Sequence, residues 1–236
     1  MENQKTNEHY IRLLAPITPD TANALLQSID NLLKMKVEKI HLLISSPGGD
    51  VSQGIAIHNY LKHLPIELST YNIGIVDSIG VIIYCAGKNR FCDSRARFLI
   101  HNPKLNLQGT FQLDEKQLSE FLKSLQNDKE NIAGIISDTT GHAISEIMDL
   151  MSQPTTFTEK EAKELGLVNS ISELIIPFGT NITTIGHKSA ENIPVPIQIP
   201  TAPITQMPLQ QIIPPGIPVP GLFPQAHLGL NSKNWI

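Results

Sequence analysis

The sequence predicts an α/β fold built on a mostly parallel sheet. Three stretches rich in β-type apolar residues, Lys39 to Ser46, Ile66 to Gly74 and Ala96 to Asn102, alternate with stretches of helical periodicity. Glycine-containing or proline-containing turns punctuate the alternation. Strands that alternate with helices in this way pair in parallel through right-handed crossovers.

The helices are expected from caps and periodicity. Thr18 and Pro19 open a surface helix, and Thr158 with Glu161 has the spacing of a capping box in a late helix that Gly166 ends. A long amphipathic helix is expected over Leu113 to Asp138. The expected helices are 18–33, 51–64, 77–87, 113–138, 142–151 and 158–165.

The 236 residues suit one main domain, residues 1–175, followed by a tail, residues 176–236. Ten of the seventeen prolines lie between Pro194 and Pro224. Prolines at that density preclude a helix or a central strand, so the tail is expected to be extended or disordered. Because it is more apolar than an ordinary linker, docking on a neighbouring subunit or a partner is the alternative.

Composition excludes several classes of function. A net charge of −4 without a basic stripe argues against nucleic-acid binding. The start "MENQKTNEHY" lacks the features of a secretion signal, and no later run is apolar enough to span a membrane. Cys85 and Cys92 are too few for a disulfide framework and have no matching cluster for zinc. We expect a cytoplasmic protein without a metal or a cofactor.

Three segments carry candidate chemistry. In "SSPGGDVSQG", Gly48 and Gly49 lie between a strand and a helix, where backbone amides can bind an anionic oxygen. Ser78 begins the next helix, and the amide of Ile79 is unpaired within that helix. His101 ends an apolar strand and is a candidate for the base that a serine nucleophile requires. Each residue alone is more often structural.

Together these segments resemble a known family. "ISSPGGDVSQGIAIHNYL", "GIVDSIGVIIYCAG" and "RFLIHNP" are similar to the signatures of the Clp protease proteolytic subunits (ClpP), which are ring-forming serine peptidases. The resemblance covers Tyr10 to Leu174. It implies the ClpP/crotonase fold of stacked ββα units, with Leu113 to Asp138 as the handle helix between rings.

The resemblance also implies roles for individual residues. Ser78 is the implied nucleophile, His101 the general base, and the amides of Gly49 and Ile79 the oxyanion hole. The implied peptide-binding residues, in the glycine turn and in the edge strand of "KLNLQG", are Gly48, Leu107, Gln108 and Gly109. The aspartate that orients the histidine in the family falls on Pro154 here. Asp149 is the candidate substitute, and Asp77 is a second one.

The implied partners are a peptide or unfolded-protein substrate and further copies of the chain in a ring, one heptamer or stacked heptamers. An ATPase unfoldase is a possible partner. Two departures weaken that expectation: only nine residues precede Tyr10, where the family has axial loops, and His41 and Leu43 stand where the family has aromatic residues.

Three functions therefore compete. The first is a serine endopeptidase that degrades peptides or unfolded proteins inside a ring. The second is a catalytically weak or inactive ring subunit that acts through protein interactions, for which Pro154 argues. The third is a crotonase-type acyl-CoA enzyme, against which Ser78 and His101 argue. A Ser/Lys peptidase is disfavoured because Lys88 lies on the far side of the helix that follows Ser78.

Overall fold

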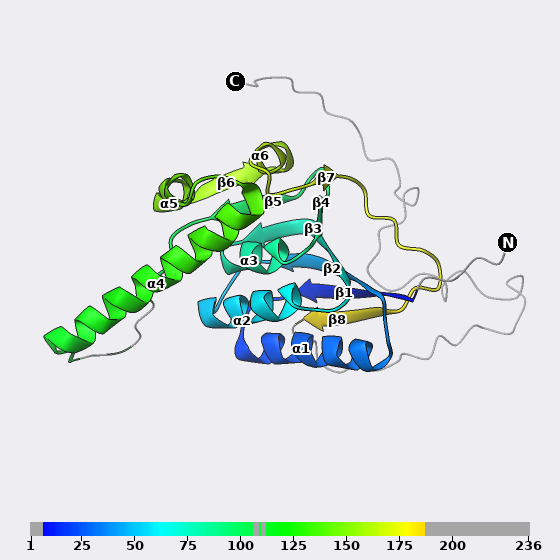
Figure 1. The fold of residues 1–236 in the computed structure, drawn as a ribbon, viewed down its shortest axis with the longest axis horizontal. Helices are drawn as coiled ribbons and strands as arrows, with labels where there is room; N and C mark the ends of the chain where they lie inside the picture. The colour runs from blue at the N-terminus through cyan, green and yellow to red at the C-terminus, as the bar shows by residue number, and fades with distance from the viewer. Residues whose placement is uncertain (1–6, 106–108, 110–111, 187–236) are drawn as a thin grey trace, which may run out of the picture. The chain divides into compact units, whose positions relative to one another are not determined.

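The fold is a mostly parallel sheet with helices packed on it (Figure 1). The computed structural model describes residues 7–105, 109 and 112–186. Its strands are β1 (Glu8–Leu14), β2 (Lys39–Ser46), β3 (Glu67–Asp77), β4 (Asn89–Cys92), β5 (Arg97–Ile100), β6 (Thr155–Thr158), β7 (Ser170–Ile171) and β8 (Ile182–Gly186). Its helices are α1 (Pro19–Lys34), α2 (Val51–Lys62), α3 (Ile79–Cys85), α4 (Glu115–Thr140), α5 (Ile144–Ser152) and α6 (Glu159–Glu164).

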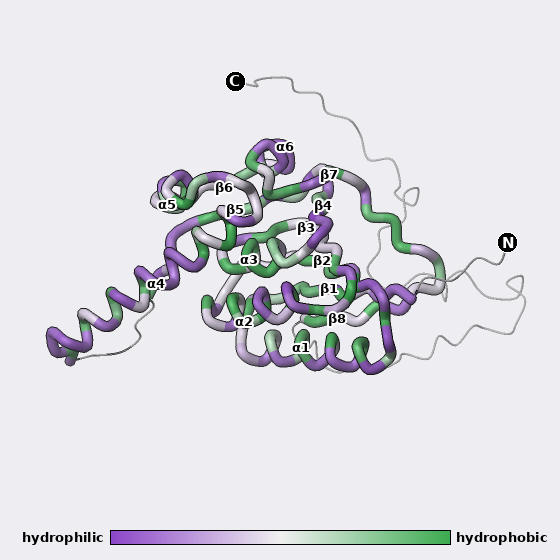
Figure 2. Tube along the Cα trace, viewed as in Figure 1, coloured by the Kyte–Doolittle hydropathy of each residue, from purple (hydrophilic) through white to green (hydrophobic). Residues whose placement is uncertain are grey.

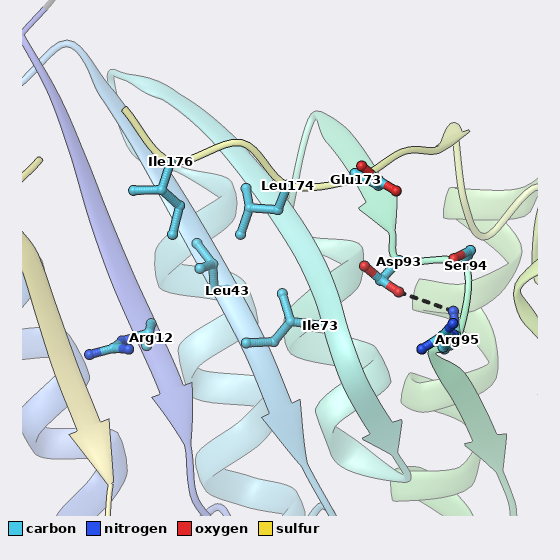
Figure 3. A pocket seen from close by; sticks show the side chains of 9 residues that line it. All are labelled: Arg12, Leu43, Ile73, Asp93, Ser94, Arg95, Glu173, Leu174 and Ile176. Atoms are coloured by element: carbon cyan, nitrogen blue, oxygen red, sulfur yellow. Dashed lines mark hydrogen bonds between the residues drawn. The ribbon is translucent and has the colours of Figure 1, made fainter. Parts of the chain in front are cut away.

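The strand order is β6-β5-β3-β2-β1-β8, and β4 pairs with both β3 and β7. Each of these pairings is parallel except the one between β5 and β6. The predicted α/β fold with a mostly parallel sheet is therefore confirmed. Figures 1 and 3 show α1, α2 and α3 together on one face of the sheet.

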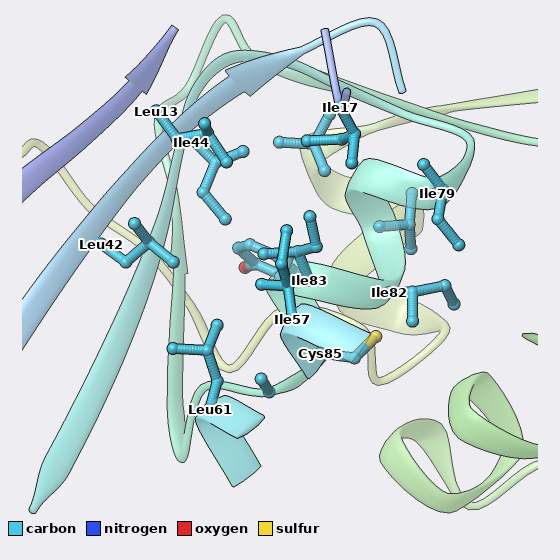
Figure 4. Packing of buried hydrophobic residues seen from close by; sticks show 14 of the residues in the cluster. Leu13, Ile17, Leu42, Ile44, Ile57, Leu61, Ile79, Ile82, Ile83 and Cys85 are labelled. Atoms are coloured by element: carbon cyan, nitrogen blue, oxygen red, sulfur yellow. The ribbon is translucent and has the colours of Figure 1, made fainter. Parts of the chain in front are cut away.

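The core lies between the sheet and these helices. Alternate residues of β2, namely Ile40, Leu42 and Ile44, have no exposed surface. Figure 4 shows Leu42 and Ile44 facing apolar side chains of α2 and α3, Ile57 and Ile83 among them. Burial of these side chains stabilises the strand–helix–strand repeats by about 1.5–3 kcal/mol per large residue. The core thus fixes the ends of β2 and β3 beside α3.

The predicted helices form with small shifts at their ends. The predicted capping box is present at α6, where the Thr158 amide donates to Glu161 Oε2 at 2.8 Å and the Glu161 amide to Thr158 Oγ1 at 3.4 Å. The long helix is α4, which ends at Gly141 with a φ of 82°. Its buried residues lie near its carboxyl end, whereas Leu118 and Leu122 are exposed. Figure 2 shows the largely hydrophilic amino-terminal half of α4.

One boundary differs in a way that matters for the site. The predicted strand over Ile66 to Gly74 continues to Asp77, and the helix predicted from Asp77 begins at Ile79. The polar residues at this junction look like a helix start in the sequence, but Asp77 still pairs with Leu99 of β5. Ser78 therefore stands alone between a strand and a helix.

Strand β8 lies beyond residue 175, the predicted end of the main domain. It adds to the edge of the sheet by pairing in parallel with β1, from Tyr10 opposite Ile182 to Leu14 opposite Gly186. The prolines between Pro194 and Pro224 lie outside the described residues, so the extended tail stays a prediction. Over the described part of the chain, none of the helices has the length and apolarity needed to cross a membrane.

Candidate active site

The glycine turn after β2 lies directly against Ser78. Gly48 is buried and has a φ of 88°, a conformation that side chains disfavour. A Cβ atom on Gly48 would lie 2.8 Å from Ser78 Cβ and 2.8 Å from the Asp77 carbonyl oxygen. Only glycine therefore allows the backbone of this turn to approach Ser78 so closely.

The amide of Gly49 is directed away from the neighbouring strand segment. Ile17 and Gly49 form a parallel bridge, in which the Ile17 amide donates to the Gly48 carbonyl at 2.8 Å and the Asp50 amide donates to the Ile17 carbonyl at 2.8 Å. In such a bridge the residue between the two bonded neighbours points its own N–H to the opposite side. The Gly48 amide, by contrast, donates to Ser46 Oγ at 3.2 Å. Gly49 is thus the better oxyanion donor of the two glycines.

Ser78 occupies a strained turn between β3 and α3. Its φ of 55° and ψ of −126° are rare for a residue with a side chain and cost about 1–3 kcal/mol. The Ser78 amide donates to the Leu99 carbonyl at 2.7 Å, which fixes the turn to β5. Ile79 is the first residue of α3, so its amide has no acceptor within the helix. The Ser78 hydroxyl and the Ile79 amide consequently belong to adjacent residues of the chain.

His101 directly follows β5, the strand to which Ser78 is bonded. Its Nδ1 lies 2.6 Å from the Asn102 carbonyl oxygen. Because a carbonyl only accepts, Nδ1 must carry the proton, and Nε2 of the neutral ring then holds the lone pair. The Asn102 amide donates to the Met151 carbonyl at 2.9 Å, which ties this segment to the end of α5. The ring is therefore held in the tautomer that a general base needs, although the described hydrogen bonds include none between His101 and Ser78.

An ion pair between a buried carboxylate and an exposed guanidinium lies beside these residues. Both carboxylate oxygens of Asp77 accept from the Arg97 guanidinium at 3.1 Å. The Asp77 side chain is 9% exposed and that of Arg97 is 44% exposed. Burial raises the pKa of Asp77, while Arg97 and, more weakly, the charge of a protonated His101 lower it. Sequence reasoning considered Asp77 but missed Arg97. The spacing of two between Arg97, Leu99 and His101 is the signal that could have found it.

The position opposite His101 holds no carboxylate. Strands β5 and β6 are antiparallel, and their register ends with Ile100 opposite Thr155. Extending this register by one residue sets Pro154 opposite His101. Asp149, the predicted substitute, is an exposed residue of α5. Its carbonyl oxygen accepts from the Ser152 hydroxyl at 2.6 Å. The described contacts do not bring the Asp149 carboxylate to His101.

The predicted peptide-binding strand is only partly described. Leu107 and Gln108 lie outside the described residues. Gly109 has a φ of 96° and no neighbouring atom within 4 Å of a Cβ built on it. Gly48 is the one predicted peptide-binding residue that the structure places beside Ser78. Lys88 follows the carboxyl end of α3, whereas Ser78 precedes its amino end.

A separate pocket lies on the sheet face away from α1, α2 and α3 (Figure 3). It has a volume of about 630 Å³, and none of the candidate catalytic residues lines it. Its lining includes Leu43, one of the residues at the family's aromatic positions. His41, the other, stacks on Tyr10 with ring centroids 4.3 Å apart and contacts Glu8 Oε2 through Nε2 at 3.0 Å. The lining residues are Arg12, Leu43, Ile73, Asp93, Ser94, Arg95, Glu173, Leu174 and Ile176.

The parts of a serine hydrolase site are a serine on a strained turn, a histidine of fixed tautomer directly after the adjacent strand, and two amides that no described residue pairs with. Comparison with known proteins identifies the family to which the chain belongs. The Clp protease family model matches residues 2–174, so the chain belongs to the Clp protease family.

Individual relatives agree with this family. The chain is 32% identical over 136 residues to the ATP-dependent Clp protease proteolytic subunit 2 of Corynebacterium diphtheriae. That match covers 57% of this chain and 66% of the relative, slightly less than two thirds of its length. A solved structure of a ClpP1 mutant from Listeria monocytogenes matches with a TM-score of 0.64 and 25% identity. It covers 70% of this chain and 92% of the solved chain. The resemblance to ClpP and the ClpP/crotonase-like fold are therefore confirmed.

Proposed function

We propose that this chain is a serine endopeptidase of the ClpP type. The observation that carries the proposal is the hydrogen bond from the Ser78 amide to the Leu99 carbonyl, because it anchors the strained serine to the strand that leads into His101. In the proposed reaction, His101 Nε2 takes the proton of the Ser78 hydroxyl as Ser78 Oγ attacks a peptide carbonyl. The amides of Gly49 and Ile79 stabilise the oxyanion, and His101 then protonates the leaving amine.

The proposed substrates are peptides or unfolded proteins inside an oligomeric ring, formed as one heptamer or as stacked heptamers. Head-to-tail contact between identical subunits closes such rings. The family membership supports this assembly, and the exposed Leu118 and Leu122 of α4 are apolar positions available for contact between rings. A cytoplasmic location and cooperation with an ATPase unfoldase belong to the same proposal. No metal or cofactor has a part in it.

Labelling by a fluorophosphonate probe tests the proposal directly, since the probe reacts with an activated serine. The purified oligomer is expected to become labelled, and Ser78→Ala and His101→Ala are each expected to abolish the label. Peptide mapping should place the adduct on Ser78. Labelling that persists in Ser78→Ala would assign the reaction to another residue and refute the proposed nucleophile.

A second function is favoured by Pro154. If the proline opposite His101 leaves the pair inactive, the chain acts as a structural subunit of a mixed ring. The expected result is then a wild-type oligomer that remains unlabelled but assembles with an active subunit, as seen by native mass spectrometry. The same labelling experiment therefore separates the two functions.

A further inference from the structure

A serine–histidine pair needs negative charge near the histidine. The imidazole becomes an imidazolium during the reaction, and in serine proteases a buried carboxylate stabilises that charge and fixes the tautomer. In this chain Pro154 lies opposite His101 and can do neither. The Asn102 carbonyl fixes the tautomer, since it accepts from Nδ1 at 2.6 Å. A carbonyl is neutral, however, so the charge must come from elsewhere.

The pairing of β3 with β5 puts one carboxylate on the correct face. Asp77 lies opposite Leu99 in a parallel register. Directly paired residues share a face of a sheet, and so do residues two apart along a strand. Asp77 and Arg97 obey this rule, as their ion pair shows. His101 is two residues beyond Leu99 and one residue past the end of β5. Continuing the alternation by that one residue puts it on the face of Asp77, on the other side of Leu99 from Arg97.

The environment of Asp77 suits a charged group with a function. A buried carboxylate loses hydration and persists only with compensating partners. Arg97 is such a partner, and it holds the carboxylate rigidly because both Asp77 oxygens lie in its fork. A carboxylate has about four acceptor sites, so this pairing does not exhaust it. The charge of a protonated His101 lowers the pKa of Asp77, though less than Arg97 does.

We propose that Asp77, held by Arg97, is the positioning residue that supplies the negative charge for His101. The inference rests on the proposed pairing of His101 with Ser78. Two groups then perform the two tasks of the triad aspartate. The Asn102 carbonyl holds the tautomer of His101, and Asp77 stabilises the imidazolium that His101 becomes. Asp77 contacts no substrate and acts only through the histidine.

Carbethoxylation of His101 by diethyl pyrocarbonate tests this inference without requiring enzyme activity. The reagent attacks the neutral imidazole, so the rate as a function of pH, followed by peptide mass spectrometry on the intact oligomer, gives a pH midpoint for His101. Asp77→Asn is expected to lower that midpoint, because an opposite charge favours the protonated ring. Arg97→Gln is expected to raise it, because the protonated ring of His101 then compensates the Asp77 carboxylate in place of Arg97. Asp138→Asn, at an exposed position of α4, is the matched control and should leave the midpoint unchanged.

Fluorophosphonate labelling tests the consequence for the serine. Asp77→Asn is expected to slow labelling about tenfold, less than the roughly 10⁴-fold loss in kcat when a protease triad loses its aspartate, because the tautomer here is held independently. Pro154→Asp in the Asp77→Asn background should restore the rate by returning a carboxylate to the position opposite His101. Pro154→Asn in the same background should not restore it.

The outcomes separate the two proposals. An unlabelled wild-type oligomer refutes the peptidase function, and the carbethoxylation midpoints then still decide the role of Asp77. A midpoint that is the same in wild type, Asp77→Asn and Arg97→Gln overturns the inference, even if the wild type is fully labelled. A shift in Asp149→Asn but not in Asp77→Asn also overturns it, because Asp149 is then the partner. Opposite shifts in Asp77→Asn and Arg97→Gln support it, since general loss of structure would not move the midpoint in two directions.

Discussion

Replacing Gly48 by alanine should lower the free energy of unfolding more than most surface substitutions do. Two effects add. The φ of 88° disfavours any residue with a Cβ, and glycine-to-alanine changes at such positions cost about 1 kcal/mol once the lower entropy of the unfolded alanine chain is included. The new Cβ would also lie 2.8 Å from Ser78 Cβ and from the Asp77 carbonyl oxygen, and overpacking of a buried site costs about 1–3 kcal/mol more. We expect a total loss of about 2–4 kcal/mol in the free energy of unfolding.

Gly141 provides the matched control. Its φ is 82°, but no atom lies within 4 Å of a Cβ built on it. Gly141→Ala should therefore show only the backbone cost of about 1 kcal/mol. Urea denaturation followed by far-ultraviolet circular dichroism, at equal protein concentration because assembly stabilises the subunits, measures both variants. Gly48→Ala should also lose fluorophosphonate labelling, whereas Gly141→Ala should keep it. Equal losses of stability in the two variants would refute the close contact between Gly48 and Ser78.

Three further outcomes are expected. Ser78→Gly should be more stable than Ser78→Ala by about 1 kcal/mol in the same urea assay, because glycine relieves the strain at φ 55°; a more stable alanine variant would contradict the strained turn. Burial lowers the pKa of His58 from its ordinary value of 6.5. The stability that the neutral His58 side chain contributes is therefore present above pH 6.5 and is lost as the pH falls toward the lowered pKa. Accordingly, His58→Gln should lose less stability than wild type between pH 7.5 and pH 5.5 (about one unit either side of the free imidazole pKa), and an unchanged pH dependence would count against a buried neutral imidazole. Asp114 caps α4 by accepting from the Gln117 amide at 2.7 Å. Asp114→Ala should therefore cost about 1 kcal/mol in the free energy of unfolding measured with urea, and no loss would show that the cap does not form.

Much of the fold follows from local patterns in the sequence. The strand–turn–helix order around Gly48 and Gly49 depends on nearby residues only, and it was predicted at the correct place. The junction at Ser78 was predicted two to three residues too early, because Asp77 still pairs with Leu99 of β5. The short strands β4 and β6 were not predicted, because four residues carry too little periodicity. The pairing of Asp77 with Arg97 depends on the register between two strands twenty positions apart in sequence. Such a register is set by tertiary packing, which a single sequence does not display.

The pairing of β8 with β1 fixes where Gly186 lies in the fold. Because β8 is parallel to β1, Gly186 lies at the carboxyl ends of the strands, the same end as Ser78 and His101. In the order β8-β1-β2-β3-β5, β8 is three strand spacings from β3, which leads into Ser78, and four from β5, which leads into His101. The larger separation is about 19 Å, which an extended chain crosses in about six residues. A peptide fused shortly after Gly186 is therefore a tethered competitor, at an effective concentration that reaches about millimolar for short linkers. An inserted peptide that must stay clear of the site belongs before β1, whose amino end lies at the opposite end of the strands.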